Sequence, residues 1–462
     1  MIASILKQIT FILLILFLGI NFLKLLRLKA GLAEKLSSGF MLGIGFSTFG
    51  LFLLGFVGYK FNFQNILFFL IGVNVLLTLL NLMLKNKYSL DIFSVVGFFK
   101  KLDLLEKVLV GGIVFFLLTS LIRNLYWPIW MWDAVQMYDY RAKLIVESQS
   151  IFFPAQSYYD ILYPLLTSLL HSILYVAGST NPQYVYTLVF FALIMGVYAF
   201  VRKYSSRKFA IVASFAVSSF PLVYQHSIQP LTNLTHSTFL VLGVFYLIIW
   251  LSKDKSKDFF VATLLFSFAR FTRNEPVWMA VFAFMIIYLL IKRKLLKDKS
   301  ILYLLVFFAI NYIVGFVIIK YNQWYRLTPN KFFTDQFGFV EQFVLSSGNI
   351  NLSWLLDPLV MIFRYVIWEV FILILFTIMI FLKHRRIVLK SEVFLLSTFL
   401  LWYLFILFFG SIFYRLISTD IEFKALSGSL ERFSIVWQVL VFVLFFLVLY
   451  GFLGEKKYGK KV

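Results

Sequence analysis

A short polar segment, residues 132–143, carries the best candidates for chemistry in this sequence. It follows a long apolar run and contains two carboxylates, Asp133 and Asp139. Two cations, Arg141 and Lys143, complete it. A carboxylate at the end of a membrane helix can act as a general base toward a hydroxyl or an amine. Cations beside it suit a phosphate or pyrophosphate group. We therefore expect a catalytic site here.

Each of these residues also has a simpler interpretation. Asp133 can cap the next helix while Trp132 belongs to an interfacial aromatic belt. Asp139 and Lys143, at positions i and i+4, can form a surface ion pair of little energetic value. An aromatic belt does not explain why two acids and two cations follow one another so closely. We expect Asp133 to be the catalytic general base, Asp139 to be a weaker catalytic candidate, and Trp132 and Tyr138 to support the site.

The composition places this site in a membrane protein. The chain has 462 residues, of which 61% are hydrophobic and 14% charged, and its mean hydropathy is +0.90. Apolar runs of about 20 residues can cross about 30 Å of hydrocarbon, and these runs lack the alternation of barrel strands. We predict an all-α, polytopic membrane protein with about thirteen transmembrane helices. The predicted spans are 9–26, 37–57, 65–84, 106–126, 183–201, 208–224, 235–251, 258–271, 276–292, 301–320, 358–382, 392–414 and 433–453.

The distribution of charge orients the chain. The net charge of +22 falls in short loops between apolar runs, which indicates cytoplasmic loops and excludes a nucleic-acid partner. The basic loops 24–35 and 85–107 are then cytoplasmic and residues 132–143 lie outside. The apolar stretch 161–178 would place the basic loop 202–208 outside if it crossed, so we predict an interfacial helix there. We expect a multi-pass protein of the inner or plasma membrane with its site on the extracytoplasmic side.

A second polar cluster occupies a tight turn between two short apolar stretches. It contains Arg270, Arg273 and Glu275. Ionisable groups at membrane depth are costly and usually face a cavity with a role, although an internally paired Arg–Glu turn is the simpler interpretation. We predict that these arginines bind an anionic group. Arg432, before the last predicted span, is a further outward cation or a helix-end residue that snorkels to the interface.

The sequence indicates no cofactor. There is no cysteine, and the histidines His171, His226 and His236 are scattered without an His-x-x-x-His pair. A zinc site is therefore not expected. A divalent metal ion is compatible with the acids, but no motif indicates one.

The order and spacing of these motifs resemble the GT-C superfamily of membrane glycosyltransferases, which use sugars linked to polyprenyl phosphate. That superfamily includes protein mannosyltransferases and the aminoarabinose transferase of lipid A. The resemblance covers about residues 106–453. It is carried by an acid after a span (Trp132-Asp133), a helix opening on an aromatic residue and proline (Tyr163-Pro164), an Arg–Glu turn (Arg273-Asn274-Glu275) and Arg432.

The sequence also departs from the family pattern. Asp133 and Asp139 are six residues apart, where family members often have adjacent acids. Tyr163 stands where a histidine is common. The second outer loop has Gln229 and Asn233 where some members place another acid, which puts a metal-dependent mechanism in doubt.

The resemblance implies a hexosyl or pentosyl transferase with a polyprenyl-phosphate-linked sugar as donor and a glycan, lipid or protein as acceptor. Asp133 would deprotonate the acceptor hydroxyl, and attack at the anomeric carbon would invert its configuration. Lys143, Arg273 and Arg432 would stabilise the phosphate leaving group. Arg141 and Arg270 would add to the phosphate site, with Tyr163 and Glu275 in support.

Three regions follow from this interpretation. Residues 1–105 form an accessory block of three helices, 106–453 form the catalytic core, and 454–462 form a basic cytoplasmic tail. A polysaccharide polymerase or ligase is the closest alternative, because it also uses a lipid-linked donor. A flippase or transporter is less favoured, because no internal repeat is evident. A non-enzymatic assembly partner is the last alternative.

Overall fold

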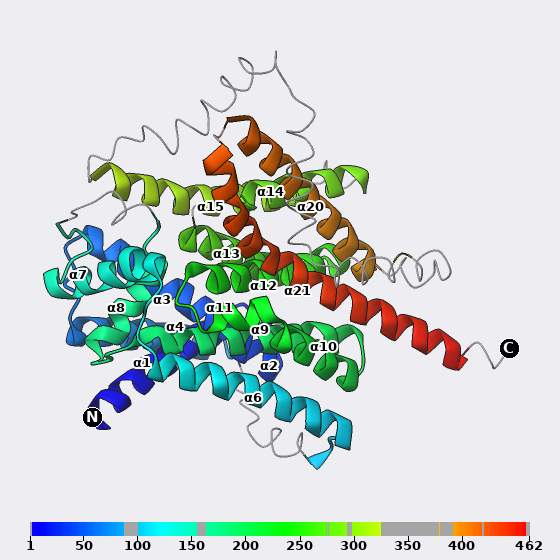
Figure 1. Cartoon of the computed structure of the whole chain (residues 1–462), viewed down its shortest axis with the longest axis horizontal. Helices are drawn as coiled ribbons and strands as arrows, with labels where there is room; N and C mark the ends of the chain where they lie inside the picture. Colours follow the sequence, from blue (N-terminus) through cyan, green and yellow to red (C-terminus); the bar gives the residue numbers. More distant parts are fainter. Residues whose placement is uncertain are drawn as a thin grey trace. The chain divides into compact units, whose positions relative to one another are not determined.

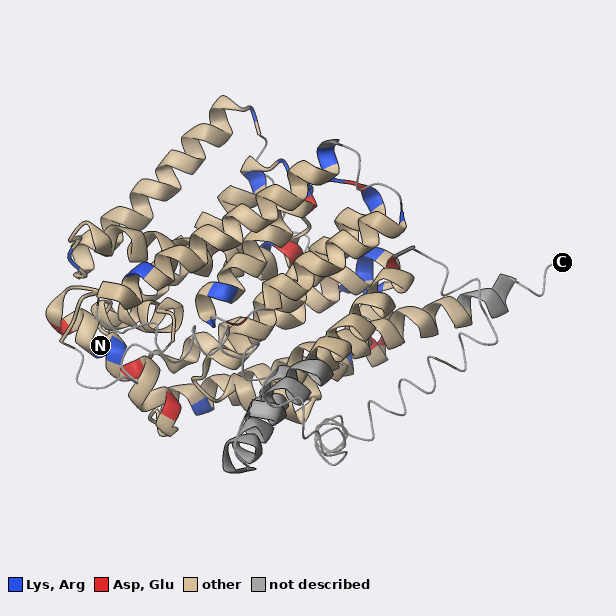
Figure 2. Cartoon of the chain, turned by 90° about the horizontal axis from the view of Figure 1, so that it is seen from above, with Lys and Arg blue, Asp and Glu red and all other residues tan. Residues whose placement is uncertain are grey.

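The structure is a computed structural model and contains only helices within the residues that it describes. These are 2–86, 100–154, 163–273, 275, 277–292, 298–324, 378, 391–417 and 420–458, with the backbone alone described for 298, 391, 407–417, 420–433 and 454–458. Eight of the described helices are long and apolar enough to cross a membrane, or nine if one bent pair counts as a single span. Long stretches of helix carry no charged residue (Figure 2). The all-α membrane fold is confirmed, whereas the number thirteen stays a prediction. The predicted span 358–382 lies outside the described residues apart from Ile378.

The chain divides into two compact units, Met1–Glu275 and Pro276–Val462. Figure 1 labels their helices. The first unit contains α1 (Ile2–Leu25), α2 (Leu32–Glu34), η1 (Lys35–Gly39), α3 (Phe40–Phe56), α4 (Phe63–Met83), α6 (Leu104–Tyr126), η2 (Ala134–Asp139), α7 (Tyr140–Ser148), α8 (Leu166–Val176), η4 (Pro182–Tyr184), α9 (Val185–Tyr204), α10 (Arg207–Ser219), α11 (Pro221–Ser227), α12 (Thr232–Lys253) and α13 (Ser256–Thr272). The second unit contains α14 (Val277–Ile291), α15 (Asp298–Trp324), α20 (Ser391–Ile417) and α21 (Asp420–Tyr458).

Helix α12 forms the centre of the first unit. Every residue from Thr232 to Trp250 is buried, because α12 packs along both α9 and α13. The Phe245 ring of α12 stacks on the Phe200 ring of α9 with centroids 4.1 Å apart. A helix that is apolar on all faces is stable only inside a protein or a membrane. The predicted N-terminal spans are α1, α3 and α4, and α3 also contacts α8, α9 and α13.

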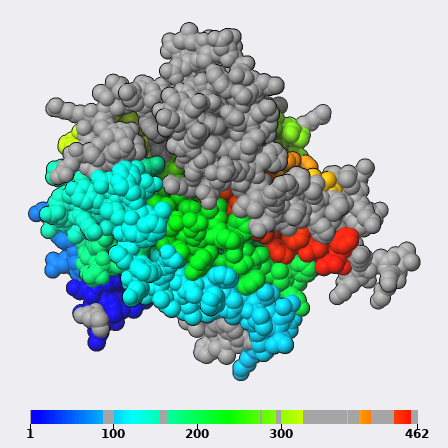
Figure 3. Space-filling model, in the orientation of Figure 1, coloured from blue at the N-terminus to red at the C-terminus, as the bar shows by residue number. Residues whose placement is uncertain are grey.

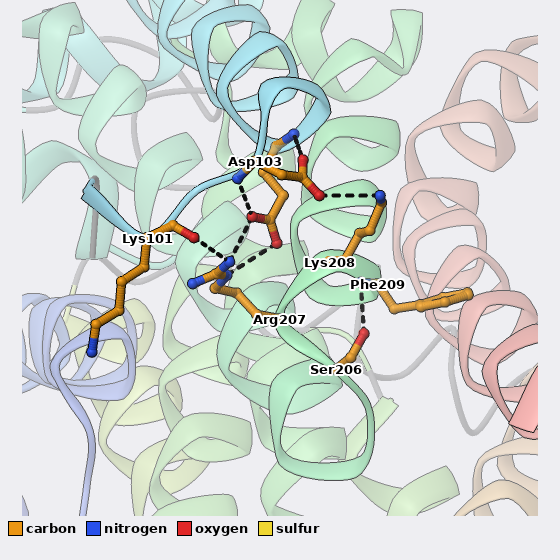
Figure 4. Close-up of polar contacts among 7 residues, drawn as sticks. Lys101, Asp103, Ser206, Arg207, Lys208 and Phe209 are labelled. Atoms are coloured by element: carbon orange, nitrogen blue, oxygen red, sulfur yellow. Dashed lines mark hydrogen bonds and ion pairs between the residues drawn. The ribbon is translucent and has the colours of Figure 1, made fainter. Parts of the chain in front are cut away.

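The basic loops of the first unit meet at one end of its helices. There the Lys257 ammonium donates to the Arg27 carbonyl at 3.1 Å. Arg207 binds Glu106 at 2.7 Å, beside a capping box that Glu106 forms with Asp103 at the start of α6 (Figure 4). Lys208 completes this network with Asp103 at 3.2 Å (Figure 4). We call this the basic end.

The opposite end carries the predicted site. Asn181, before α9, donates to the carbonyls of Asn124 and Trp127 at the end of α6, at 2.9 and 2.8 Å. The chain therefore leaves α6 and enters α9 at the same end of the bundle. Helix α8 has 11 residues, which span only about 16 Å. Both facts agree with the prediction that 161–178 does not span the membrane.

The environment of α8 differs from that of a helix lying on a membrane surface. All residues from Leu166 to Leu174 are buried, because α8 packs against η2, α3 and α7. In Figure 1, α7 and α8 lie side by side at the left of the first unit, next to α3. The predicted span 208–224 is not a single straight helix: α10 and α11 meet at an angle of 68°, as in a broken span or a re-entrant loop. Pro221 opens α11, since proline lacks the N–H that would continue α10 but suits a first helical turn.

Candidate functional site

The polar segment after α6 folds into one turn of π-helix, η2, followed by α7. Asp133 stands at the N-terminus of η2 and is half-buried. Trp132 beside it is 59% exposed, as expected for an interfacial aromatic residue. Ala134 and Tyr138 point the other way, into an apolar cluster with Leu231. The segment therefore has one accessible carboxylate at its start and a buried face behind it.

Asp139 lies at the centre of a buried polar cluster. Asp139 is 3% exposed. Its carboxylate contacts the Lys143 ammonium at 2.8 Å and the His171 Nδ1 at 3.3 Å. The Tyr175 hydroxyl donates to the same carboxylate at 2.5 Å. Burial acts to raise the pKa of Asp139, but the bonds and charges of His171, Lys143 and Tyr175 outweigh it and lower the pKa to about 2. Asp139 is thus an ionised anchor between α7 and α8.

Arg141 is fully buried and binds the backbone. Its guanidinium donates to the carbonyls of Tyr163 and Pro164, at 2.6 and 3.4 Å. These carbonyls precede Leu165, the N-cap residue of α8, so they lie outside the hydrogen bonds of that helix. The guanidinium also lies 5.8 Å from the Tyr138 ring centroid. Arg141 therefore fixes the entry to α8 against η2.

The predicted Arg–Glu turn forms a second polar cluster at the same end. The Arg273 Nε atom lies 2.5 Å from the Glu275 carboxylate, and Arg273 also donates to the side-chain oxygen of Asn233. Burial acts to lower the pKa of Arg273, but Glu275 and neighbouring tyrosines raise it overall, so its charge is kept. The His236 Nδ1 donates to the Ala269 carbonyl at 3.0 Å, which turns Nε2 toward Glu275 at 3.5 Å.

Two tyrosines join the clusters. The rings of Tyr138 and Tyr163 lie 5.8 Å apart, and the Arg273 guanidinium lies 5.8 Å from the Tyr163 ring. The Tyr138 hydroxyl is 3.4 Å from the Thr232 hydroxyl. Burial raises the pKa of Tyr138 to about 12, so Tyr138 stays neutral. Segments more than 100 residues apart in the sequence therefore meet around one tyrosine pair.

Most of the predicted site residues come together in this region. Arg270, 8% exposed, lies on α13 one turn before Arg273. Arg432 lies within α21 of the second unit, but its side chain is outside the described residues. Around the two tyrosines the structure gathers Asp139, Arg141, Lys143, Arg273 and Glu275, with Asp133 and Trp132 at the start of the same η2 segment.

Four residues of the site were not predicted from the sequence: His171, Tyr175, Asn233 and His236. His171 and Tyr175 are four residues apart on α8, so they share one helical face. That spacing was the available signal, but only the packing of α8 on α7 shows that the face meets Asp139. In the described part of the chain, no group of three or more His, Asp or Glu side chains could hold a metal ion.

The arrangement defines a multi-pass membrane protein with a desolvated polar site at one end of its helices. Residues 161–319 match the family model for dolichyl-phosphate-mannose-protein mannosyltransferases, a GT-C type glycosyltransferase family. The match covers about a third of the chain, supports the resemblance to GT-C enzymes and indicates a membrane glycosyltransferase of that type. It includes Tyr163, His171 and the Arg273 turn, but not residues 132–143. No curated protein and no solved structure matches the chain.

Proposed function

We propose that this protein transfers a hexose or pentose from a polyprenyl-phosphate donor to a glycan, lipid or protein acceptor, with inversion, on the extracytoplasmic face of the inner or plasma membrane. One observation carries the proposal: at the end opposite the basic loops, Lys143 binds Asp139, and Arg273 lies over the Tyr163 ring that packs beside Tyr138. A lipid-linked phosphate is the substrate group that such cations, placed at the end of membrane helices, fit best.

Asp133 is the proposed general base. A base must be able to accept a proton, and the low pKa of Asp139 makes that carboxylate a weak one. Asp139 is also almost fully buried, whereas Asp133 is half-buried and accessible. We therefore assign Asp139 to positioning: it holds Lys143 at 2.8 Å and ties α7 to His171 of α8.

Lys143 and Arg273 are the proposed ligands of the donor phosphate. The Lys143 side chain is 60% exposed although it is paired, so a phosphate can reach its ammonium. Arg273 is held rigidly by Glu275 and Asn233, which prevents it from reorganising as charge develops on the phosphate. Arg270 and Arg432 are further candidates for this group. Arg141 is assigned to positioning, because its donors already bind two carbonyls.

The proposed reaction needs no reactant other than the donor and the acceptor. The acceptor oxygen forms a bond to the anomeric carbon while the bond from that carbon to the phosphate oxygen breaks. The acceptor proton passes to Asp133, and the electron pair of the broken bond remains on the polyprenyl phosphate. Lys143 and Arg273 then face a phosphate with one more negative charge. One base and one stabilised leaving group suffice for this inverting displacement.

The Asp133→Asn variant tests the base. It should lower the release of polyprenyl phosphate from a panel of polyprenyl-phosphate sugars, added to membranes containing the full chain, by about 10²–10⁴-fold. The matched control is Gln136→Glu in the same η2 segment, which should keep transfer within a few-fold. Full transfer by Asp133→Asn would overturn the assignment of the base.

The sidedness is tested separately, and the absence of native cysteine makes the test simple. A cysteine in place of Arg202 should be shielded from a membrane-impermeant thiol label in intact cells. A cysteine in place of Trp130 should react with it. Labelling of the Arg202 position in intact cells would contradict the extracytoplasmic site.

A further inference from the structure

A cavity of about 760 Å³ lies near the basic end, away from the site described above. Its walls are apolar side chains of α6, α9 and α10, including Val114, Phe191 and Met195. Its polar lining comes from Lys29, Glu34, Arg202 and Lys203. The volume falls within the range of about 300–1,000 Å³ that is common for ligand sites.

The depth of the cavity matches half of a bilayer. Its lining on α9 runs from Phe191 to Lys203, a distance of roughly 18 Å along a helix. Half of the hydrocarbon core is about 15 Å thick. The cavity therefore reaches from the level of the lipid headgroups to about the middle of the membrane, which is the extent of one lipid acyl chain.

One wall of the cavity belongs to a helix that faces lipid. In the most apolar stretch of α6 only 11% of the residues are buried inside the protein. Val114 itself is 44% exposed and Phe115 beside it 60%. The helix lies at the molecular surface in Figure 3, where it is coloured cyan. A lipid of the surrounding bilayer can therefore enter the cavity from the side.

The charge at the mouth selects among lipids. Lys29, Arg202 and Lys203 stand against a single carboxylate, Glu34, so the mouth is cationic. Glu34 is 3.8 Å from the Lys203 ammonium, too far to be a close ion pair. Arg202 donates to the Ser205 carbonyl at 3.0 Å through Nη1, which leaves other guanidinium donors to face the cavity. Basic pockets between membrane helices are suited to anionic headgroups.

We propose that this cavity binds one acidic glycerophospholipid from the leaflet that faces the basic loops. The phosphate lies among Lys29, Arg202 and Lys203, and an acyl chain lies along Val114 and Met195. The proposal does not depend on sugar transfer, because the cavity shares no residue with the site around Asp133, Asp139 and Arg273.

Native mass spectrometry of the full chain, purified in detergent and titrated with phosphatidylglycerol or phosphatidylcholine, tests the site. The wild type should retain one phosphatidylglycerol in preference to phosphatidylcholine. Each cation near an anionic lipid contributes about fivefold in affinity, so Lys29→Gln/Arg202→Gln/Lys203→Gln should weaken phosphatidylglycerol binding by about 100-fold. Equal retention of the two lipids by the wild type would overturn the proposal.

Two controls keep the result specific. Lys107→Gln/Lys255→Gln removes exposed cations that do not line the cavity, and should leave phosphatidylglycerol binding unchanged. Val114→Trp fills the cavity without changing charge and should abolish the bound lipid. Loss of binding in the Lys107/Lys255 variant to the same degree as in the triple variant would show general surface attraction and contradict the site. Retained binding in Val114→Trp would contradict the place assigned to the acyl chain.

Discussion

The two ends of the first unit use charged residues in opposite ways. At the basic end, the side chains of Lys203 and Lys208 are 30% and 47% exposed and face water or headgroups. At the site end, Arg141 is fully buried and Asp139 is 3% exposed. Burying a charge costs several kcal/mol unless partners compensate for it. The site end buries its charged side chains more deeply than the basic end does. It is therefore the better candidate for chemistry, although the basic end carries more charged residues.

The exposure of the partners separates the ends further. Glu106 at the basic end is also buried, but its ion-pair partner Arg207 of α10 is 30% exposed. At the site end, Asp139 of η2 meets His171 of α8, and Arg273 meets Asn233 of α12. At the basic end one partner stays in contact with water, whereas His171 and Asn233 are themselves buried, so the charges of the candidate site are desolvated together with their partners. Three experiments test this contrast between the ends.

The largest stability effect is expected for Arg273→Ala. Removing one partner of a buried ion pair leaves Glu275 uncompensated, which should lower the free energy of unfolding by about 3–5 kcal/mol. Thermal unfolding of the full chain in detergent measures it. Adding Glu275→Gln to the variant should recover part of the loss, because the orphaned charge is then removed. A loss no larger than that of an exposed lysine variant would contradict the contrast between the ends.

A pH effect is expected from Asp139. Its pKa falls from 3.8 to about 2 on folding, so its contribution is complete above about pH 4 and is lost as the pH falls toward 2. The shift corresponds to about 2 kcal/mol of unfolding free energy. Between pH 5 and pH 2, stability should fall by about that much more in the wild type than in Asp139→Asn. Parallel pH profiles for the two proteins would contradict the assigned network.

The smallest effect is expected for Lys208→Gln at the basic end. Its pair with Asp103 is solvent-exposed on both sides, so water replaces the lost contact. Neither the unfolding midpoint nor sugar transfer should change measurably. Lys143→Gln is the matched variant at the site end, since Lys143 is also exposed and paired. It should reduce transfer, and equal activity of the two variants would remove the functional distinction between the ends.

Patterns along the chain were enough to predict the all-α membrane fold and to select candidate residues whose segments pack together in the first unit. Hydrophobic length and loop charge are local properties, and each can be read along the chain without knowledge of packing. The family match over residues 161–319 agrees with the motif order read in the same way. The contacts of a single residue inside the site cannot be read along the chain in this way, because they depend on packing.

The contacts that the site residues make could be learned only from the folded chain. Asp139 and Lys143 were predicted as an i, i+4 pair, but burial of Asp139 and its contacts with His171 and Tyr175 required α8 to pack on α7. Arg141 was expected at a phosphate and instead holds two carbonyls. Such contacts join segments about 20–40 residues apart or more, and their energies depend on desolvation that no linear pattern records. For that reason the sequence pointed to the candidate site, and the fold supplied the contacts on which the proposed roles rest.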